Sequence, residues 1–383
     1  MIDYVEIRSK DTRELIGIID TAKSIIWHVM YYDVGDFEIY VPCTPLTINL
    51  ATEGNYVTRP NDRHVGIIEH VEITYNAQDG RMLIISGRMA KSILDRRVIY
   101  KRILHLTPAW SKLAVINPTI LSGNVESAAR TVVINNAIDC RFDTNRNISA
   151  LVLGAHSGST AIIQDADGNP SDKQVTYDNM LTWIDDFLKE YSIGAEILIN
   201  DALKLEFVCF EGVDRSFDST DHEPVIFSRE FDNLVSSDLN YDETESKNMA
   251  LVGGEGEGTE RICAIKYGTE TGIDRREMFI DASGTSQTYY DEEGQEQTLT
   301  REDYAAQLVL IGAQELPNRQ PILSFDGEIN LQNSVYKYGV DFDLGDIVSI
   351  QDNDINIYEN VRIVEITEVQ DDNGYNISAV YSL

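Results

Sequence analysis

The chain has 383 residues, with 31 Lys and Arg against 64 Asp and Glu, and a formal net charge of −33 at pH 7. This length exceeds one ordinary core, so two or three domains are expected. Residues 1–105 carry 13 basic and 14 acidic side chains, whereas residues 106–383 carry 18 and 50, a net charge of −32. Such a remainder would repel phosphates, which argues against free nucleic-acid binding. The near-neutral first part is expected to pack against other subunits; high solubility is the simpler interpretation of the charge.

No stretch approaches the roughly 20 apolar residues of a membrane span. The N-terminus MIDYVEIRSKDTR lacks the apolar core of a secretory signal, so the chain is expected to be made and folded in the cytosol. The cysteines are too far apart in sequence for a local disulfide framework or a metal-ligand pair, and we interpret them as small buried hydrophobes. They are Cys43, Cys140, Cys209 and Cys263.

The first hundred residues contain short alternating segments punctuated by Gly and Pro, which is typical of a small antiparallel barrel or sandwich. The segment Val65–Val98 adds two alternating strands joined by a turn at 76–80. The other strands are predicted at Tyr4–Arg8, Leu15–Ile19, Ser24–Tyr32 and Phe37–Val41.

A basic helix is predicted from about Arg88 to Lys101, because Ala90, Ile93, Leu94 and Val98 fall at helical spacing. Its polar side would carry Arg88, Lys91, Arg96, Arg97, Lys101 and Arg102. In so acidic a chain, these side chains are expected to pair with carboxylates of neighbouring subunits or domains, and a solvated face is the alternative.

The middle of the chain mixes helices and strands. Thr176 is predicted to cap a helix that runs through Tyr191 and stops at Gly194, and a hairpin over 195–209 follows. A second helix is predicted from Thr300 to Leu316, ended by Pro317. The last sixty residues return to short strands at Ile322–Ile329, Ile347–Gln351, Val361–Val369 and Tyr375–Tyr381.

These patterns predict a β-rich α+β fold in which two small antiparallel β-barrel-like domains flank an α/β middle region. The predicted boundaries are 1–104, 105–320 and 321–383. The acidic middle region can be discontinuous and contribute strands to the second barrel.

Three motifs of the sequence have residue types that could support chemistry. The Gly-rich run 253–258 follows a predicted strand but lacks Gly-Lys-Ser/Thr and carries Glu255 and Glu257, so a tight or flexible loop is favoured over a phosphate site. In GAHSGS, Ser157 lacks the spacing of a nucleophile elbow. A cell-wall hydrolase using His156 or Ser157 remains the first alternative function.

Asp165, Asp167 and Asn169 alternate like calcium ligands, but glycine stands at the fourth position instead of the sixth, which favours a solvated turn. A carbohydrate-binding module is the second alternative and would need exposed aromatic residues. The candidates are Trp110, Tyr289 and Tyr290, for which core or hairpin positions are favoured. No catalytic residue, metal or cofactor is predicted.

Six strings in a fixed order resemble one family. They are GIIEHVEI followed by SGRMAKSILDRRVI, FEGVDRS at Phe210–Ser216, NMALVGGEGEGTER at Asn248–Arg261, RREMFIDAS, and YGVDFDLGDIVSI at Tyr338–Ile350. Together they resemble the tail-tip (baseplate) hub proteins of siphophages, the hub or tail-associated proteins of phage tails.

The resemblance implies a homotrimeric structural ring with two barrel-like tube domains per subunit, at the tail tip of a virion assembled in the bacterial cytoplasm. It implies contacts with distal tube proteins, the tape-measure protein and receptor-binding or fibre proteins, and DNA passing only in transit. Many such hubs carry an enzymatic C-terminal extension; since the sequence ends at Leu383, directly after the last predicted strand, none is expected here. Acidic side chains lining the channel would keep DNA or the tape measure from sticking.

The motif residues are candidates for interfaces. Gly345 has a direct rationale, because glycine can adopt the positive φ of a turn into the buried strand that follows. The full set is Gly87, Arg88, Arg96, Arg97, Asp214, Arg215, Gly253, Gly254, Gly256, Gly258, Arg261, Leu344, Gly345 and Asp346.

Overall fold

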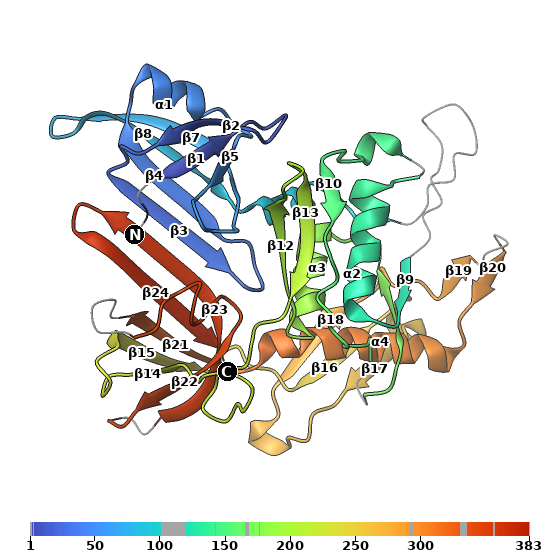
Figure 1. Cartoon of the computed structure of the whole chain (residues 1–383). Coiled ribbons are helices and arrows are strands. Elements are labelled where there is room, and N and C mark those ends of the chain that lie inside the picture. The colour runs from blue at the N-terminus through green and yellow to red at the C-terminus, as the bar shows by residue number, and fades with distance from the viewer. Residues whose placement is uncertain are drawn as a thin grey trace.

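The computed structural model describes residues 2, 4–100, 119–141, 143–164, 168–175, 177–290, 295–329, 335–354 and 357–382. Its largest element is a ten-stranded sheet that contains strands from both ends of the chain (Figure 1). The main path runs β15-β21-β24-β23-β3-β4-β8-β7, and β22 pairs with β23 and with β14. The bounds are β3 Ser24–Met30, β4 Asp36–Pro42, β7 His70–Asn76, β8 Gly80–Arg88, β14 Ile226–Ser228, β15 Leu234–Asp242, β21 Ile322–Ile329, β22 Ile347–Asp352, β23 Ile357–Asp371 and β24 Gly374–Ser382.

The two ends of the chain meet where β3 pairs with β23. The antiparallel register runs from Met30 opposite Glu365 to Ile25 opposite Gln370. One hydrophobic core therefore serves N-terminal and C-terminal strands, with Trp27, Phe227 and Tyr381 all fully buried. The β-rich α+β class is confirmed. The expected barrels are not, because the described strands close no barrel and the two terminal sets share one open sheet.

A four-stranded sheet completes the N-terminal module, in the order β2-β1-β5-β6. Its strands are β1 Val5–Arg8, β2 Leu15–Ile19, β5 Tyr56–Thr58 and β6 Gly66–Ile67. In β1 the fully buried Val5 and Ile7 alternate with Glu6 and Arg8, the period expected of a strand, whereas β5 is buried throughout. Helix α1, Pro45–Leu50, packs on β2 and is capped by Thr44 in a capping box.

The basic helix predicted from about Arg88 to Lys101 is confirmed only in part, because the segment is shorter and is a 3-10 helix. Strand β8 continues to Arg88, and a 3-10 helix over Ala90–Arg96 follows. All residues 90–94 are buried, so the segment has no solvated face of the expected kind. The Met89 amide donates to Gly35 O and the Ala90 amide to Val65 O, and Met89 is extended, so the helix begins only at Ala90. Lys101 and Arg102 lie outside the described residues.

The middle region begins with a second core, formed by helices on small sheets. Helix α3 starts later than predicted: Asn179 is its cap and accepts from the Leu181 and Thr182 amides, while Thr176 lies outside the described residues. The hairpin predicted next is confirmed as β12 and β13. The bounds are β9 Thr119–Ser122, α2 Val125–Val133, β10 Leu151–Leu153, β11 Asp172–Val175, α3 Met180–Lys189, β12 Gly194–Ile199 and β13 Leu205–Phe210, with a π-helical turn at Ile134–Ile138 and a 3-10 turn at Thr144–Arg146.

A third, smaller core lies between helix α4 and the sheet β17-β16-β18. The predicted helix is confirmed: Thr300 caps it, its hydroxyl accepting from the Asp303 amide at 3.1 Å. The bounds are β16 Met249–Gly253, β17 Cys263–Lys266, β18 Glu277–Asp281, β19 Thr288–Tyr290, β20 Glu296–Thr298 and α4 Arg301–Glu315, with 3-10 turns at Gly258–Glu260, Gly272–Asp274 and Pro317–Arg319.

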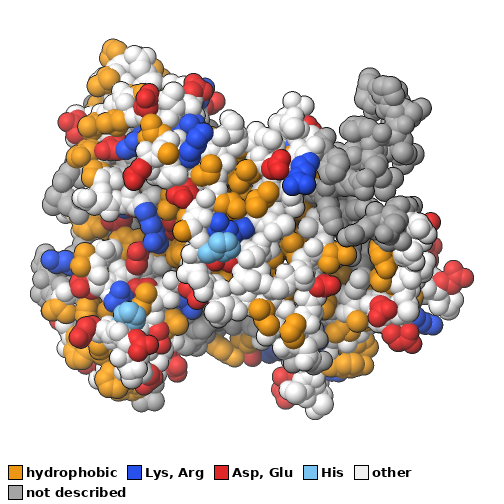
Figure 2. Space-filling model, turned by 45° about the vertical axis from the view of Figure 1, so that its right-hand side comes forward, with side chains coloured by type: hydrophobic (Ala, Val, Ile, Leu, Met, Phe, Trp, Pro, Cys, Tyr) orange, Lys and Arg blue, Asp and Glu red, His pale blue; other side chains and the backbone are white. Residues whose placement is uncertain are grey.

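The distribution of acidic side chains and the burial of the cysteines can be compared with the sequence analysis. Acidic side chains are scattered over the visible face and do not gather in one patch (Figure 2). Cys140 and Cys209 are buried as expected, but Cys43 is half-buried and Cys263 is exposed. Cys263 begins β17, an edge strand of a three-stranded sheet. No described helix has the length and apolar character needed to cross a bilayer.

Candidate functional site

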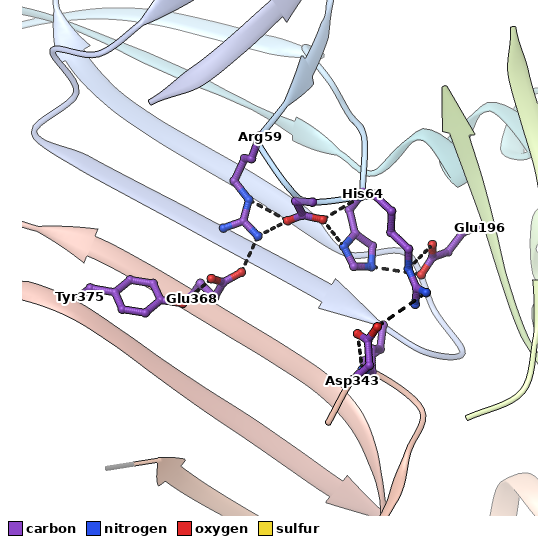
Figure 3. Close-up of polar contacts among 9 residues, drawn as sticks. Arg59, His64, Glu196, Asp343, Glu368 and Tyr375 are labelled. Atoms are coloured by element: carbon purple, nitrogen blue, oxygen red, sulfur yellow. Dashed lines mark hydrogen bonds and ion pairs between the residues drawn. The ribbon is translucent and has the colours of Figure 1, made fainter. Parts of the chain in front are cut away.

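A buried network of charged side chains lies where the three parts of the chain meet (Figure 3). Its centre is the segment 59–64, which follows β5 and turns through Asn61, at a φ of 60°. The turn brings four charged side chains toward strands from the middle and the end of the chain. We call the set the His64 junction, and its members are Arg59, Asp62, Arg63, His64, Glu196, Asp343 and Glu368.

Arg59 connects this segment to the C-terminal strands. Its guanidinium donates from Nε to Asp62 Oδ2 at 2.8 Å and from Nη2 to the Glu368 carboxylate on β23. It also lies over the Trp27 ring, 4.8 Å from the centroid. Tyr375 on β24 donates its hydroxyl to the other oxygen of Glu368. Arg59 is therefore paired on both sides and stacked, as a buried guanidinium requires.

His64 connects the segment to the middle region. Nδ1 lies 2.6 Å from Asp62 Oδ1, and Nε2 lies 3.1 Å from Glu196 Oε1 on β12. Burial alone would lower the pKa of His64, but the Glu196 charge and the hydrogen bond to Asp62 outweigh it and raise the pKa to about 10. The side chain is thus an imidazolium at neutral pH, donating from both nitrogens. Although burial favours their protonated forms, the His64 charge holds the pKa values of Asp62 and Glu196 below their usual range.

Arg63 reaches a third element. Its Nε is 3.3 Å from Glu196 Oε2 and its Nη1 is 3.7 Å from Asp343 Oδ2, in the loop before β22. The guanidinium lies over the Phe210 ring, 4.7 Å from the centroid. One short segment thus holds the middle region and two C-terminal elements together. The side chains of Arg63 and Asp343 are each 39% exposed, so this outer pair contributes less to stability than the buried pair of His64 and Glu196, where removing one partner costs about 3–5 kcal/mol.

A cavity of about 20 Å³ adjoins this network, lined in part by His64, Lys91 and Glu196. It has room for about one water molecule and is too small for a substrate. Lys91 pairs with Asp185 on α3 at 2.9 Å. Burial raises the pKa of Asp185 to about 6 despite the opposing Lys91 charge. The carboxylates and the imidazolium are engaged with one another, so the arrangement fixes structure and offers no free acid or base for catalysis.

A second junction joins two of the motifs found in the sequence. The Asp346 carboxylate accepts from the amides of Val213 at 2.7 Å and Asp343 at 2.9 Å, and from Arg215 Nε at 2.9 Å. Gly345, at a φ of +91°, packs against the Tyr31 ring. We call this set the Asp346 junction, and its members are Tyr31, Gly212, Val213, Arg215, Asp343, Gly345 and Asp346.

The other residues of these two motifs support the same contact. Asp214 pairs with Ile347 through a parallel bridge, and its side chain accepts from the Ser216 amide at 2.9 Å. Leu344 is buried in the main core. A Cβ on Gly212 would lie 1.8 Å from Gly345 O, so the two backbones meet where only glycine fits.

The first motif forms a separate cluster. Arg88 donates to both oxygens of Glu69, at 2.8 and 3.0 Å, and to Asp95 at 3.1 Å. Arg96 lies 4.0 Å from Glu69. Arg97 donates to Arg146 O at 3.1 and 2.8 Å. At Gly87, a Cβ would lie 1.8 Å from Ile67 O, which explains the glycine. These arginines contact groups of their own chain.

The glycine-rich motif packs around Arg261. The guanidinium donates to the carbonyls of Gly253 and Gly254, each at 3.0 Å, and to Asp281 on β18. Gly256 and Gly258 both have positive φ, at 102° and 56°. The loop is thus a tight structural turn, in keeping with the sequence prediction.

The hydrolase candidates do not form a triad. The Ser157 hydroxyl donates to Glu126 Oε2 at 2.7 Å, and Glu126 also pairs with Arg130 at 3.3 Å. His156 faces the same carboxylate from the surface, 3.4 Å away, so it does not stand between Ser157 and the acid as a general base must. Glu126 anchors the loop.

The remaining candidates give little chemistry. Asp165, Asp167 and Trp110 lie outside the described residues, as does the side chain of Tyr290. Tyr289 is about one-third exposed, at 37%. Among the described residues, no group of three or more His, Cys, Asp or Glu side chains could hold a metal ion.

Sequence reasoning missed the His64 junction. The only available signal was an acidic residue inside an apolar strand, as at Glu196 in GAEILI or at Glu368 in β23. A glutamate that is buried must be paired, but its partner lies 132 positions away, at His64. Nothing in the spacing of the sequence identifies that partner.

Comparison with solved structures shows which proteins share this fold. The tail protein of Neisseria meningitidis MC58 matches with a TM-score of 0.52 and 11% identity, over 99% of this chain and 96% of that one. The 43 kDa tail protein of prophage MuSo2 from Shewanella oneidensis matches with a TM-score of 0.53 and 12% identity, over 99% and 98%. The chain therefore has the fold of these phage tail proteins.

The family follows from the sequence. The profile of the Siphovirus ReqiPepy6 Gp37-like protein family matches residues 4–381, nearly the whole chain, and the chain belongs to this family. The predicted membership of a siphophage tail protein family is confirmed. No protein of curated function matches the sequence.

Proposed function

We propose that the protein is the trimeric structural hub of a siphophage tail tip, a ring that continues and caps the tail tube. The observation that supports this most is the pairing of β3 with β23, which unites an N-terminal and a C-terminal β module in one sheet. Residues 1–104 and 321–383 each supply most of one tube module, and residues 105–320 supply the middle region and the strands β14 and β15. Three copies then present six modules, which adapts a three-fold tip to a six-fold tube.

The proposed role is assembly, without catalysis. The two junctions support it, because their polar groups fix the middle region against the sheet and leave no reactive group free. The hub contacts the distal tube and tape-measure proteins and anchors receptor-binding or fibre proteins. It is assembled in the bacterial cytoplasm and resides in the virion tail tip.

The first test is the native mass of the purified chain, measured by light scattering over a range of concentrations. We expect three chains per particle, and negative-stain images with a central hole. A monomer at every concentration, also in the presence of the distal tube protein, would exclude the trimeric hub.

The proposed acidic lining of the channel leads to a separate prediction. Residues 106–383 carry a net charge of −32, and carboxylates of this part would line the passage for DNA. Replacing lumen Asp and Glu residues by Lys should slow DNA ejection from assembled virions, because fixed positive charges attract phosphates. The same number of replacements on the outer surface is the control. Unchanged ejection in the lumen variants would refute this part of the proposal.

A further inference from the structure

The eight strands along the main path of the large sheet repeat one pattern twice. In the N-terminal module, the chain forms β3, β4, β7 and β8, and these lie side by side in the order first, second, fourth, third. In the C-terminal module, the chain forms β15, β21, β23 and β24, and these lie in the same order. The sheet thus consists of two modules with the same strand order.

Within one chain, these modules are joined head to tail. The third strand of the C-terminal module, β23, pairs with the first strand of the N-terminal module, β3. Among the described strands of the path, only β15 and β7 have a neighbour on one side alone, and they lie at its opposite ends (Figure 1). They are again a first strand and a third strand. The two free edges are therefore of the same kinds as the edges that the chain already joins.

The strand directions fit a second joint of this kind. Every neighbouring pair along the path is antiparallel, from β15 with β21 to β7 with β8. Eight alternating strands leave β7 and β15 running in opposite directions. A rotation about an axis along the strands would therefore place β15 of another copy antiparallel to β7, which is how β23 lies beside β3.

The outer edge of β7 has backbone groups directed to its open side. The Cys43 amide donates to Arg81 O, so the backbone groups of Arg81 point toward β4 and those of Met82 toward β7. Met82 is opposite Thr74, so Thr74 points toward β8, and the N–H and C=O of Ile73 point to the open side. The strand HVEITYN also has none of the lysines or prolines that protect edge strands. Another strand can therefore pair here.

Apolar side chains beside both free edges are left uncovered. Ile73 is opposite the buried Leu83, on the core face of the sheet, and is still 55% exposed. On β15, the register places Tyr241 on the face that carries the buried Tyr381, and Tyr241 is 61% exposed. Both side chains lie where the sheet ends, and a further strand would cover them.

We propose that β15 of one copy pairs antiparallel with β7 of the next copy and so repeats, between copies, the joint that β23 and β3 make within a chain. This inference rests on the proposed trimeric hub and names the contact that closes it. Each N-terminal module then lies between its own C-terminal module and that of a neighbouring copy. The contact joins two different edges, so it is heterologous and closes into a ring of three when each step is a third of a turn.

A proline on the open side of β7 tests this joint. The N–H of Ile73 points away from β8, so Ile73→Pro should leave the fold intact, as prolines do on the outer side of edge strands. It should remove a hydrogen bond of the joint and block the close approach of β15. We expect the concentration needed for assembly in light scattering to rise about ten-fold or more, with unchanged circular dichroism.

Ile18→Pro is the matched control. Ile18 lies on β2, the edge strand of the four-stranded sheet, and is 43% exposed. The Ser9 amide donates to Glu14 O, so alternation along β1 turns Glu6 toward β5, and Ile18, opposite Glu6, directs its N–H to the open side. This variant should assemble like the wild type.

The outcomes separate the joint from the hub. A wild-type trimer that Ile73→Pro retains would overturn the joint and leave the hub in place, and so would an equal loss of assembly in both proline variants. A wild type that stays monomeric, also in the presence of the distal tube protein, would overturn both.

Cross-linking tests the geometry, also if a proline variant fails to fold. Ile73→Cys and Tyr241→Cys are made in a Cys263→Ser background, which removes the exposed native thiol and serves as the control. When the two variants are co-expressed with different tags, a short bifunctional thiol reagent should link chains that carry different tags. Each variant expressed alone should give no linked pair. Linked pairs from either variant alone, or none from the mixture, would refute the joint.

Discussion

The His64 junction and the Asp346 junction both hold the middle region to the large sheet, but by different chemistry. At His64, side chains neutralise side chains: an imidazolium lies between two carboxylates, and Arg59 bridges to Glu368. At Asp346, a carboxylate binds two backbone amides, and glycines let two backbones touch. The first depends on the charge state of several distant residues, and the second depends mainly on backbone shape. This difference decides how each junction should fail.

The largest effect is expected from Gly212→Ala at the Asp346 junction. The added Cβ would lie 1.8 Å from the Gly345 carbonyl oxygen, and backbone cannot move aside as a side chain can. We expect a loss of more than about 4 kcal/mol in the free energy of unfolding, or no soluble protein. Gly284→Ala, where no atom lies within 4 Å, is the control for urea unfolding. A Gly212→Ala variant as stable as the control would contradict the close backbone contact.

Glu196→Gln should come next, because it removes the negative charge that lies between Arg63 and the buried His64 and leaves His64 with Asp62 as its charged partner. The expected loss is about 3–5 kcal/mol in urea unfolding. The additional change His64→Gln should restore part of it, since the buried cation that lost Glu196 is then gone. Glu38→Gln, on an exposed position of β4, serves as control. Simple additivity of the two changes would show that Glu196 and His64 are not coupled.

The two junctions should also respond differently to alkali. The folded-state pKa of His64, about 10, lies above the unfolded value of 6.5, so its contribution is complete below pH 6.5 and is lost as the pH rises through 10. A shift of one pKa unit corresponds to about 1.4 kcal/mol of stability. Discounting this value, we expect the free energy of unfolding to fall by about 2 kcal/mol between pH 7 and pH 10. His64→Gln should flatten the profile, whereas Asp346→Asn should not. Parallel profiles for His64→Gln and the wild type would refute the buried imidazolium.

The smallest effect is expected from Arg215→Ala. Asp346 loses one charged partner but keeps the amides of Val213 and Asp343, and the arginine side chain is 23% exposed. We expect a loss of about 1–2 kcal/mol, the usual worth of one partly buried charged hydrogen bond. Arg141→Ala, which removes an exposed surface pair, should change stability by less than about 0.5 kcal/mol. If Arg215→Ala costs as much as Glu196→Gln, the two junctions do not differ as described.

Local signals located much of the fold and one of the two junctions. The helix capped by Thr300, the hairpin β12–β13 and most terminal strands could be predicted because caps, turns and alternation act over a few residues. The motifs around Arg215 and Asp346 were singled out as well, though not as partners. The basic helix after Arg88 is shorter than predicted and is a 3-10 helix, and the amides of Met89 and Ala90 bond to Gly35 and Val65 instead of to preceding residues of the segment.

The sequence by itself determined the β-rich class, the near-neutral first part against an acidic remainder, and the membership in a siphophage tail family. Only the tertiary structure decided that both chain ends share one sheet, through the pairing of Met30 with Glu365. It alone brought His64 to Glu196 and Arg59 to Glu368, across 132 and 309 positions. The physical reason is the distance along the chain over which each signal acts. Turns and hydrophobic alternation depend on neighbouring residues, whereas burial in the folded chain decides which distant charges must neutralise one another.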